Sequence, residues 1–410
     1  MPDRSPLEVV IAGGGVAATE LLLALHDLAG RRVHITLVAP NDELDIRALR
    51  TLASFTGTAP PRVPLQPIAV RTHAAFKHTS LRHVLPAEHV VELADGRRLS
   101  YDVLVLAIGA RPTAAYQHGT VTFGLHGTGP DISSTLDDLE TGRARSAAFV
   151  VPPGVAWTLP LYELALLTAQ RLAGRDGRRL ILVTPESAPL AIFGPDAAKA
   201  AGALLGEAGV ELRLGTYADV AAPGRLTLRP GGDGLDVDRI VALPRLAGAA
   251  PDGVSRDADG FVEVDDTGRV RESEDLFAVG DATSFPIKQG GLACQLADVV
   301  AEHLAARSGA DVSPTLFRPV LRGQLLAGPR TLHLTSGIAG GAGAGVASAR
   351  AMWRPSHKVD ARYLSRLLLD DPAFGIPPVG IDVAISLPSP SALERDPLAL
   401  DPYTPLSPAR

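Results

Sequence analysis

Short apolar runs alternate with longer segments of helical periodicity along this chain, starting close to the N-terminus. Residues 9–12 are fully apolar and run into a glycine-rich turn at 13–15, and residues 16–28 then carry leucines at helical spacing. A second apolar run follows at 34–38. Strand, helix and strand in this order predict a βαβ unit, and therefore a parallel, doubly wound sheet.

The next strong pattern is a hairpin followed by a buried strand. Residues 90–100 alternate between apolar and polar positions around Asp95 and Gly96, which favour a tight turn. Residues 101–107 form an apolar run that ends before Gly109, so we expect a buried strand that stops there.

A second set of strands and helices begins near residue 146. The apolar patterns predict strands at 147–151, 179–184 and 210–214, helices at 159–172 and 196–208, and a returning strand at 238–243. This is again the alternation of an α/β domain.

We therefore predict two doubly wound, Rossmann-like α/β domains and a C-terminal α+β region. The first domain is discontinuous, with residues 1–115 and 245–315, and the second domain, 116–244, is inserted into it. The α+β region covers 316–370. The tail, 371–410, is rich in proline, so we expect it to be extended or disordered.

Composition narrows the functional classes. The chain has 410 residues, of which 46% are hydrophobic, as in ordinary globular proteins with large cores. Its net charge of -6 argues against a nucleic-acid partner. No apolar run is long enough to cross a bilayer, and the N-terminus has no apolar signal core, so we expect a cytoplasmic protein.

The cysteine count excludes several chemistries. The only cysteine, Cys294, cannot form an intramolecular disulfide, a redox dithiol or a cysteine zinc site. It falls within an apolar helical pattern, so we expect a buried side chain. His73, His78 and His83 recur at a spacing that scatters them around a helix, and we predict no metal site.

The glycine-rich turn matches a dinucleotide-binding fingerprint. Gly13 permits the tight turn, Gly15 lets the backbone approach a pyrophosphate, and Ala18 lets the helix pack against the strand. The backbone of Val16 and Ala17 then lies at a helix N-terminus, where free N–H groups and the helix dipole favour phosphate.

A second ligand-binding pattern lies far downstream, at residues 275–292. A short apolar strand ends at Gly280 and Asp281, and a helix opens at Gln289. A carboxylate at the end of a strand and a following helix N-terminus together suit a ligand with hydroxyl and phosphate groups. One ligand held by both patterns suggests a flavin.

Three segments, 9–20, 103–112 and 275–295, resemble the flavin-binding signatures of the FAD-dependent pyridine nucleotide-disulfide oxidoreductase superfamily. More narrowly, they resemble its branch of sulfide:quinone reductases, flavocytochrome sulfide dehydrogenases and type II NADH dehydrogenases. The resemblance implies FAD as cofactor. It also implies that residues 316–370 cover the flavin or form a homodimer interface.

The resemblance assigns roles to particular residues. Ala107 and Gly109 correspond to the family motif at the end of a strand, with Ile108 in place of the usual threonine. Gly280 and Asp281 correspond to the turn that binds the ribityl chain.

Three further positions follow from the same resemblance. Lys288 and Gln289 would lie at the isoalloxazine ring, where their positive potential would favour the reduced flavin. Arg47 corresponds to a contact on the adenine or ribityl side, with a solvent-exposed charge as the alternative.

The chain also departs from the family pattern. Ala39 stands where an acid normally binds the adenosine ribose, and only Asp42 or Glu43 from a loop would replace it. Residues 151–160 contain two adjacent prolines and Trp157 where a second glycine fingerprint would bind a pyridine nucleotide. Glu186 alone is weak evidence for NAD(P)H. No cysteine occurs in 145–170, so we expect no persulfide chemistry.

Trp157 and Tyr162 are candidates to line the flavin face, with aromatic core packing as the alternative. We predict an FAD-dependent oxidoreductase that takes electrons from a small-molecule donor and passes them to a quinone or another acceptor. The alternatives are a type II NAD(P)H dehydrogenase and a non-catalytic flavin-binding relative. Weak peripheral membrane contact stays open, although the tail has no amphipathic helix.

Overall fold

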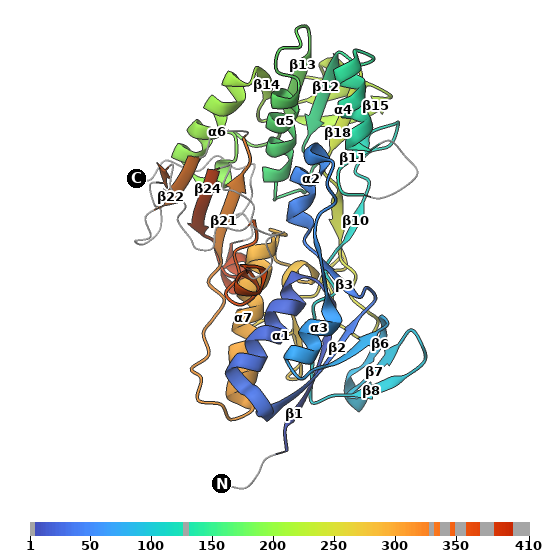
Figure 1. The fold of residues 1–410 in the computed structure, drawn as a ribbon, viewed down its shortest axis with the longest axis vertical. Coiled ribbons are helices and arrows are strands. Elements are labelled where there is room, and N and C mark those ends of the chain that lie inside the picture. Colours follow the sequence, from blue (N-terminus) through green and yellow to red (C-terminus); the bar gives the residue numbers. More distant parts are fainter. Residues whose placement is uncertain are drawn as a thin grey trace.

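The computed structural model describes residues 5–125, 131–327, 332–336, 345–348, 358–369 and 381–396. Two parallel sheets with helices against them form the two ends of an elongated molecule, and a smaller C-terminal sheet lies beside them (Figure 1). The predicted fold class, two doubly wound domains with a C-terminal α+β region, is confirmed.

The first sheet joins strands from both ends of the predicted discontinuous domain. Its order is β20 (Leu276–Ala278), β9 (Val103–Leu106), β1 (Leu7–Ala12), β2 (Val33–Ala39) and β5 (Ala75–His78), all parallel. Helices α1 (Val16–Ala29) and α7 (Gly290–Arg307) pack against each other beside this sheet (Figure 1). The hairpin predicted around Gly96 forms a separate antiparallel sheet of β6 (Leu81–Leu85), β7 (Val90–Leu93) and β8 (Arg98–Ser100).

The second sheet is also parallel. Its order is β11 (Val121–Thr122), β18 (Arg239–Ala242), β12 (Ser146–Val150), β13 (Arg179–Val183) and β14 (Val210–Arg213). Its helices are α4 (Ile132–Thr141), α5 (Leu159–Arg171) and α6 (Pro195–Glu207). A three-stranded meander of β15 (Tyr217–Ala222), β16 (Arg225–Arg229) and β17 (Gly234–Asp236) adjoins it.

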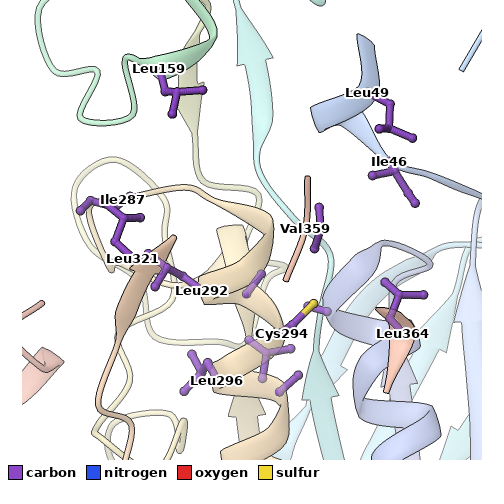
Figure 2. Close-up of a cluster of buried hydrophobic side chains, with 14 of the residues drawn as sticks. Ile46, Leu49, Leu159, Ile287, Leu292, Cys294, Leu296, Leu321, Val359 and Leu364 are labelled. Atoms are coloured by element: carbon purple, nitrogen blue, oxygen red, sulfur yellow. The ribbon is translucent and has the colours of Figure 1, made fainter. Parts of the chain in front are cut away.

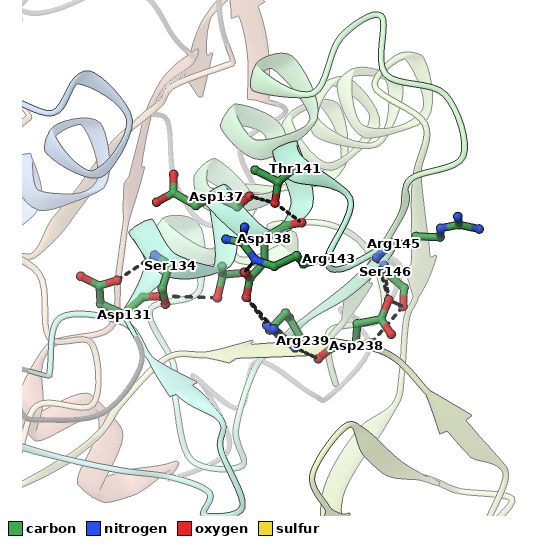
Figure 3. Close-up of polar contacts among 11 residues, drawn as sticks. Asp131, Ser134, Asp137, Asp138, Thr141, Arg143, Arg145, Ser146, Asp238 and Arg239 are labelled. Carbon is green, nitrogen blue, oxygen red and sulfur yellow. Dashed lines mark hydrogen bonds and ion pairs between the residues drawn. The ribbon is translucent and has the colours of Figure 1, made fainter.

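Two aspartates fix the ends of elements in this second domain (Figure 3). Asp131 caps α4 by accepting a hydrogen bond from the Ser134 backbone N–H at 2.8 Å. Asp238 accepts from the backbone N–H groups of Arg145 and Ser146 at 2.7 and 2.9 Å, which joins the start of β18 to the start of β12. Each bond satisfies a backbone donor that the helix or strand leaves free.

The chain passes between the two parallel sheets twice, and the two connecting segments pair with each other as strands. β10 (Arg111–Thr113) leaves the first sheet and β19 (Arg245–Ala247) returns to it, and the two form an antiparallel ribbon. The short elements of the first domain are β3 (Glu43–Asp45), which pairs with β4 (Arg62–Pro64), α2 (Arg50–Thr56), which contacts α5 of the second domain, and α3 (Leu65–Arg71), which contacts β5. The junction is where the cavity described below opens.

The C-terminal region corrects one expectation. Its sheet has the order β21 (Val320–Leu325), β24 (Ile381–Ser386), β22 (Leu332–Ser336) and β23 (Gly345–Ser348), with the short helices α8 (Leu364–Leu369) and α9 (Pro390–Arg395). The expectation that the chain after residue 370 lacks regular structure is wrong for 381–386, because this segment pairs with β21 and β22. Its isoleucines and valine alternate with other residues, but prolines flank it on both sides and obscure the strand pattern.

Within the described parts of the chain, no helix combines the length and the apolar character needed to cross a bilayer. Cys294 is completely buried on α7, as its apolar context predicts. The same described residues contain no group of three or more histidine, cysteine or acidic side chains that would hold a metal ion.

Candidate functional site

A cavity of about 860 Å³ opens where the two parallel sheets and the C-terminal region meet. Its walls come from the N-terminus of α1, the end of β20, the N-terminus of α7, the start of α5, β21 and the segment that begins at Lys358. Further lining residues come from 40–51, 107–112, 123–125 and 243–261, so segments from many parts of the chain form one site.

The glycine turn after β1 forms one wall. At Gly13 the backbone φ is +134°, and a Cβ atom would stand 2.1 Å from the Ala107 carbonyl oxygen, so no other residue fits. Gly15 borders the cavity, and a Cβ atom there would meet nothing within 4 Å. Gly15 is also the N-cap of α1 and provides no side-chain cap, so the first N–H groups of this helix are open to a ligand.

The end of β20 brings a carboxylate to the opposite wall. Gly280 has a φ of +67°, and a Cβ atom would stand 3.1 Å from the Cβ atoms of both Ala17 and Ala293. This close approach brings the following residue, Asp281, to the border of the cavity. Burial raises the pKa of Asp281, and the nearby positive charges of Lys288 and Arg47 oppose that rise.

Lys288 is the cation next to this carboxylate. Its Nζ donates to the Thr283 carbonyl oxygen and stands 3.7 Å from the centre of the Phe261 ring. Burial lowers the pKa of Lys288 to about 8, while Asp281 and Asp257 act in the opposite direction. The lysine is therefore held inside the site and does not extend into solvent.

Gln289 joins α7 to the C-terminal sheet. Its Oε1 caps α7 by accepting from the Leu292 backbone N–H at 2.8 Å, and its Nε2 donates to the Arg322 carbonyl oxygen at 3.1 Å. The predicted helix start at Gln289–Gly290 is thus found in the structure, with its N-terminus directed at the cavity wall.

No acid stands at the end of β2, the position where the resemblance leads one to expect a ribose-binding acid. Ala39 is fully buried there, in contact range of the Gly14 backbone. Of the two loop acids considered as replacements, Glu43 borders the cavity from β3, whereas Asp42 is not part of its wall. Glu43 forms an ion pair with Arg62 at 3.6 Å and is 40% exposed, so it stands at the rim.

The structure adds a buried ion pair that sequence reasoning missed. Glu163 on α5 and Lys358 pair within the cavity wall, with side chains only 1% and 5% exposed. Glu163 also accepts from the Leu326 backbone N–H at 2.9 Å, and Lys358 donates to the Gln324 carbonyl oxygen at 2.6 Å. Burial raises the pKa of Glu163, and the charge of Lys358 opposes this.

One signal for this pair was available in the sequence. Glu163 is the only acidic residue in the apolar helix 159–172, and a buried acid requires a partner. The partner is 195 residues away, and no local pattern identifies it.

Three residues of the second domain that the sequence singled out, Trp157, Tyr162 and Glu186, contact other side chains of the domain. Trp157 borders the cavity and packs edge-on against Phe193, with ring centres 5.8 Å apart. Tyr162 is fully buried and donates from its hydroxyl to Glu186 at 2.7 Å, and the Thr184 hydroxyl donates to the same carboxyl oxygen at 3.0 Å. Glu186 is 1% exposed, so in this conformation it cannot reach a ribose.

The candidate residues therefore gather in one place. Those that border the cavity are Gly15, Val16, Ala17, Arg47, Ala107, Gly109, Trp157, Asp281, Lys288 and Gln289. Gly13 and Gly280 shape its walls through their backbone conformations. Tyr162 instead belongs to the core behind Trp157.

The family described as Pyridine nucleotide-disulphide oxidoreductase matches residues 163–303. The sulfide:quinone oxidoreductase of the hyperthermophilic bacterium Aquifex aeolicus has a TM-score of 0.68 at 20% identity, over 77% of this chain and 81% of that chain. No curated protein sequence matches.

Two other solved structures share the fold. The ferredoxin reductase for the CYP199A2 system from Rhodopseudomonas palustris has a TM-score of 0.60 at 18% identity, over 83% of this chain and 90% of that chain. NDH2 from Plasmodium falciparum, in complex with NADH, has a TM-score of 0.54 at 14% identity, over 68% and 65%. The family match over residues 163–303 agrees with the superfamily that the sequence motifs resemble, and the solved structures show the same fold.

Burial of Glu186 predicts a measurable pH dependence of stability. Burial raises the pKa of Glu186 to about 7, against the hydrogen bonds from Tyr162 and Thr184. The folded state therefore binds a proton that the unfolded state has released, and the free energy of unfolding falls as pH rises from about 4.5 to 7. Glu186→Gln should remove a slope of at most about 1.4 kcal/mol per pH unit, measured by denaturant unfolding. The exposed Glu274→Gln is the control, and an unchanged slope in Glu186→Gln would contradict the assignment.

Proposed function

We propose that this protein is an FAD-dependent oxidoreductase that takes electrons from a small-molecule donor and passes them to a quinone or another acceptor. The observation that carries the proposal is the single cavity bordered by the α1 N-terminus, Asp281 and the α7 N-terminus. A dinucleotide that carries a flavin needs these three features in this order. Bound FAD would supply two-electron transfer between donor and acceptor.

The residues fit the parts of FAD. The open N–H groups at Gly15, Val16 and Ala17 suit the pyrophosphate. Asp281 is placed to accept hydrogen bonds from the ribityl hydroxyls. Lys288 and the N-terminus of α7 put positive potential where the ring system would lie, and positive potential favours the negative charge of the reduced ring.

We assign the transfer of a proton to the electron acceptor to Glu163 and Lys358. A quinone takes up two electrons and two protons. Bound reduced FAD would supply the two electrons and one proton, so one further proton must come from the site. The pair borders the cavity, and burial favours the protonated form of Glu163. In our proposal Glu163 takes up a proton before the acceptor is reduced and delivers it to the acceptor. The carboxylate then returns to its ion pair with Lys358, which holds and stabilises it.

A type II NADH dehydrogenase is the second candidate. NDH2 from Plasmodium falciparum shares the fold and was solved with NADH. Against this candidate, Glu186 is buried in hydrogen bonds, and Pro152, Pro153 and Trp157 occupy the loop where a second fingerprint would bind pyrophosphate. We therefore favour another donor. A non-catalytic flavin-binding relative remains the third candidate, favoured by Ala39 and Ile108.

The first test is flavin binding. Purified protein incubated with FAD and freed of excess should show flavin absorbance. Asp281→Asn removes charge-assisted hydrogen bonds to the ribityl chain and should weaken FAD binding roughly 10- to 100-fold in a fluorescence titration. Asp252→Asn is the control because its side chain is 72% exposed. Protein that takes up no FAD at all would refute the proposal.

The second test separates the two enzyme candidates. Under anaerobic conditions, stoichiometric NADH should leave the flavin absorbance unchanged, because the second domain offers no free ribose-binding acid at Glu186. Dithionite, followed by a water-soluble benzoquinone, should reduce and then reoxidise the flavin. Rapid bleaching by NADH would favour the dehydrogenase, and bleaching by dithionite alone with no reoxidation by any acceptor would favour the non-catalytic relative.

The third test concerns Glu163. Glu163→Gln keeps the shape of the side chain but cannot deliver a proton, so reoxidation of dithionite-reduced protein by a benzoquinone should slow roughly 10²- to 10⁴-fold. FAD content and near-ultraviolet circular dichroism should stay as in the wild type. Glu88→Gln, whose side chain is 59% exposed, is the matched control. An unchanged rate in Glu163→Gln would exclude this proton-transfer role.

A further inference from the structure

Two neighbouring carboxyl groups, Glu20 and Asp298, lie outside the cavity, between α1 and α7. Glu20 on α1 is completely buried, and the half-buried Asp298 on α7 interacts electrostatically with it, which contributes to the raised pKa of Asp298. The Oδ1 atom of Asp298 is buried and has no hydrogen-bond partner among the described residues. Two neighbouring carboxyl groups that are largely shielded from water cannot both carry a charge at low cost, so the pair shares a proton.

Glu20 uses both of its oxygens to hold the segment 358–369. Its Oε1 accepts from the Tyr363 backbone N–H at 2.8 Å, and its Oε2 accepts from the Leu364 backbone N–H at 2.5 Å. These are free donors at the start of α8, and an ionised carboxylate is the strongest acceptor for them. These two hydrogen bonds are therefore strongest when Glu20 carries the negative charge and Asp298 carries the proton.

The same segment brings Lys358 into the cavity. The Ser365 hydroxyl donates to the Val359 carbonyl oxygen at 3.2 Å and accepts from the Ala361 backbone N–H at 3.0 Å, which closes residues 359–365 into one turn. Asp360 anchors this turn to Arg322 at 2.7 Å. A shift of the turn at α8 is thus transmitted to Lys358, which directly precedes it.

The turn is packed as well as hydrogen-bonded. Val359 and Leu364 belong to the same buried cluster as Leu292 and Cys294 of α7 (Figure 2). A Cβ atom on Gly290 would stand 3.0 Å from Val359, so the turn lies tightly against the N-terminus of α7. There is little free space in which the turn could relax without moving Lys358.

We propose that Glu20 and Asp298 are a positioning pair: they fix Lys358 in the cavity through the backbone at the start of α8, and they loosen this hold when Asp298 loses its proton. Ionised Asp298 would repel Glu20 and compete with it for hydrogen-bond donors. The link to catalysis rests on the proposed role of Lys358, but the link to the backbone at α8 does not.

The surrounding charges set where this change occurs. Burial and the neighbouring Glu20 raise the pKa of Asp298 to about 8. Arg362 opposes the rise and is itself paired with Glu302, which adds to it. The other titratable groups that interact with this cluster are Asp27, Cys294, Asp360 and Tyr363.

The decisive measurement is amide hydrogen exchange in the FAD-loaded protein, followed by mass spectrometry on peptides that contain Tyr363 and Leu364. After correction for the intrinsic pH dependence of exchange, wild-type protection should fall at least roughly tenfold between pH 7 and pH 9. Asp298→Asn keeps a polar side chain of the same size beside Glu20 but cannot ionise, so its protection should be the same at both pH values. Equal loss in the two proteins, or no loss in the wild type, would overturn the proposal.

A kinetic measurement separates positioning from plain stability. Reoxidation of dithionite-reduced wild type by a water-soluble benzoquinone should slow above about pH 8, and Asp298→Asn should extend the fast range to higher pH. Glu20→Gln should lower the rate at all pH values, and Glu20→Asp should restore part of it. The exposed Asp311→Asn is the control.

The two proposals can fail separately. If exchange behaves as expected while the reoxidation profile is the same in wild type and Asp298→Asn, the carboxyl pair holds α8 but Lys358 has no part in the reaction. If Asp298→Asn does not fold, the exchange profile of the wild type and of Glu20→Asp decides, because a wild-type profile without a step near pH 8 refutes the pair on its own.

Discussion

The buried ion pair of Glu163 and Lys358 is the interaction on which the arrangement of the site depends. Neither charge is stable in a protein interior without the other. Because Glu163 belongs to α5 of the second domain and Lys358 to the C-terminal region, the pair fixes two of the three parts that surround the cavity. Lys358 also binds the Gln324 carbonyl oxygen, so the end of β21 is held in the same network. The third part, the first domain, joins through Gln289 and its bond to Arg322.

The two ends of the resulting cavity differ in the charged and polar groups that they present. One end offers the free N–H groups of α1 and suits phosphate, while Asp281 and Lys288 lie where a ribityl chain and a ring system would follow. The end towards α5 carries an acid and a base that are almost completely shielded from water. A site with this order can hold a redox cofactor along one wall and admit a substrate against the other, with proton donors supplied by the protein.

In the second domain, the residues considered for a pyridine nucleotide take part in the packing of the domain itself. Its parallel sheet is complete, but Glu186 has become part of the core through hydrogen bonds from Tyr162 and Thr184. Trp157 belongs to the loop where a second glycine fingerprint would be expected, and it packs against Phe193. The domain then contributes to the site mainly through α5, which presents Glu163.

The sequence by itself determined the parallel sheets, the glycine turn at Gly13 and the strand-end carboxylate Asp281, because each rests on a local pattern of a few residues. It left β24 unrecognised, since flanking prolines interrupt the pattern of a six-residue strand that is stable only when paired with β21. Only the tertiary structure paired Glu163 with Lys358 and joined Glu20 and Asp298 to the backbone at α8. Each of these contacts joins residues far apart in the chain, and the partner of a buried charge is decided by packing and not by sequence spacing.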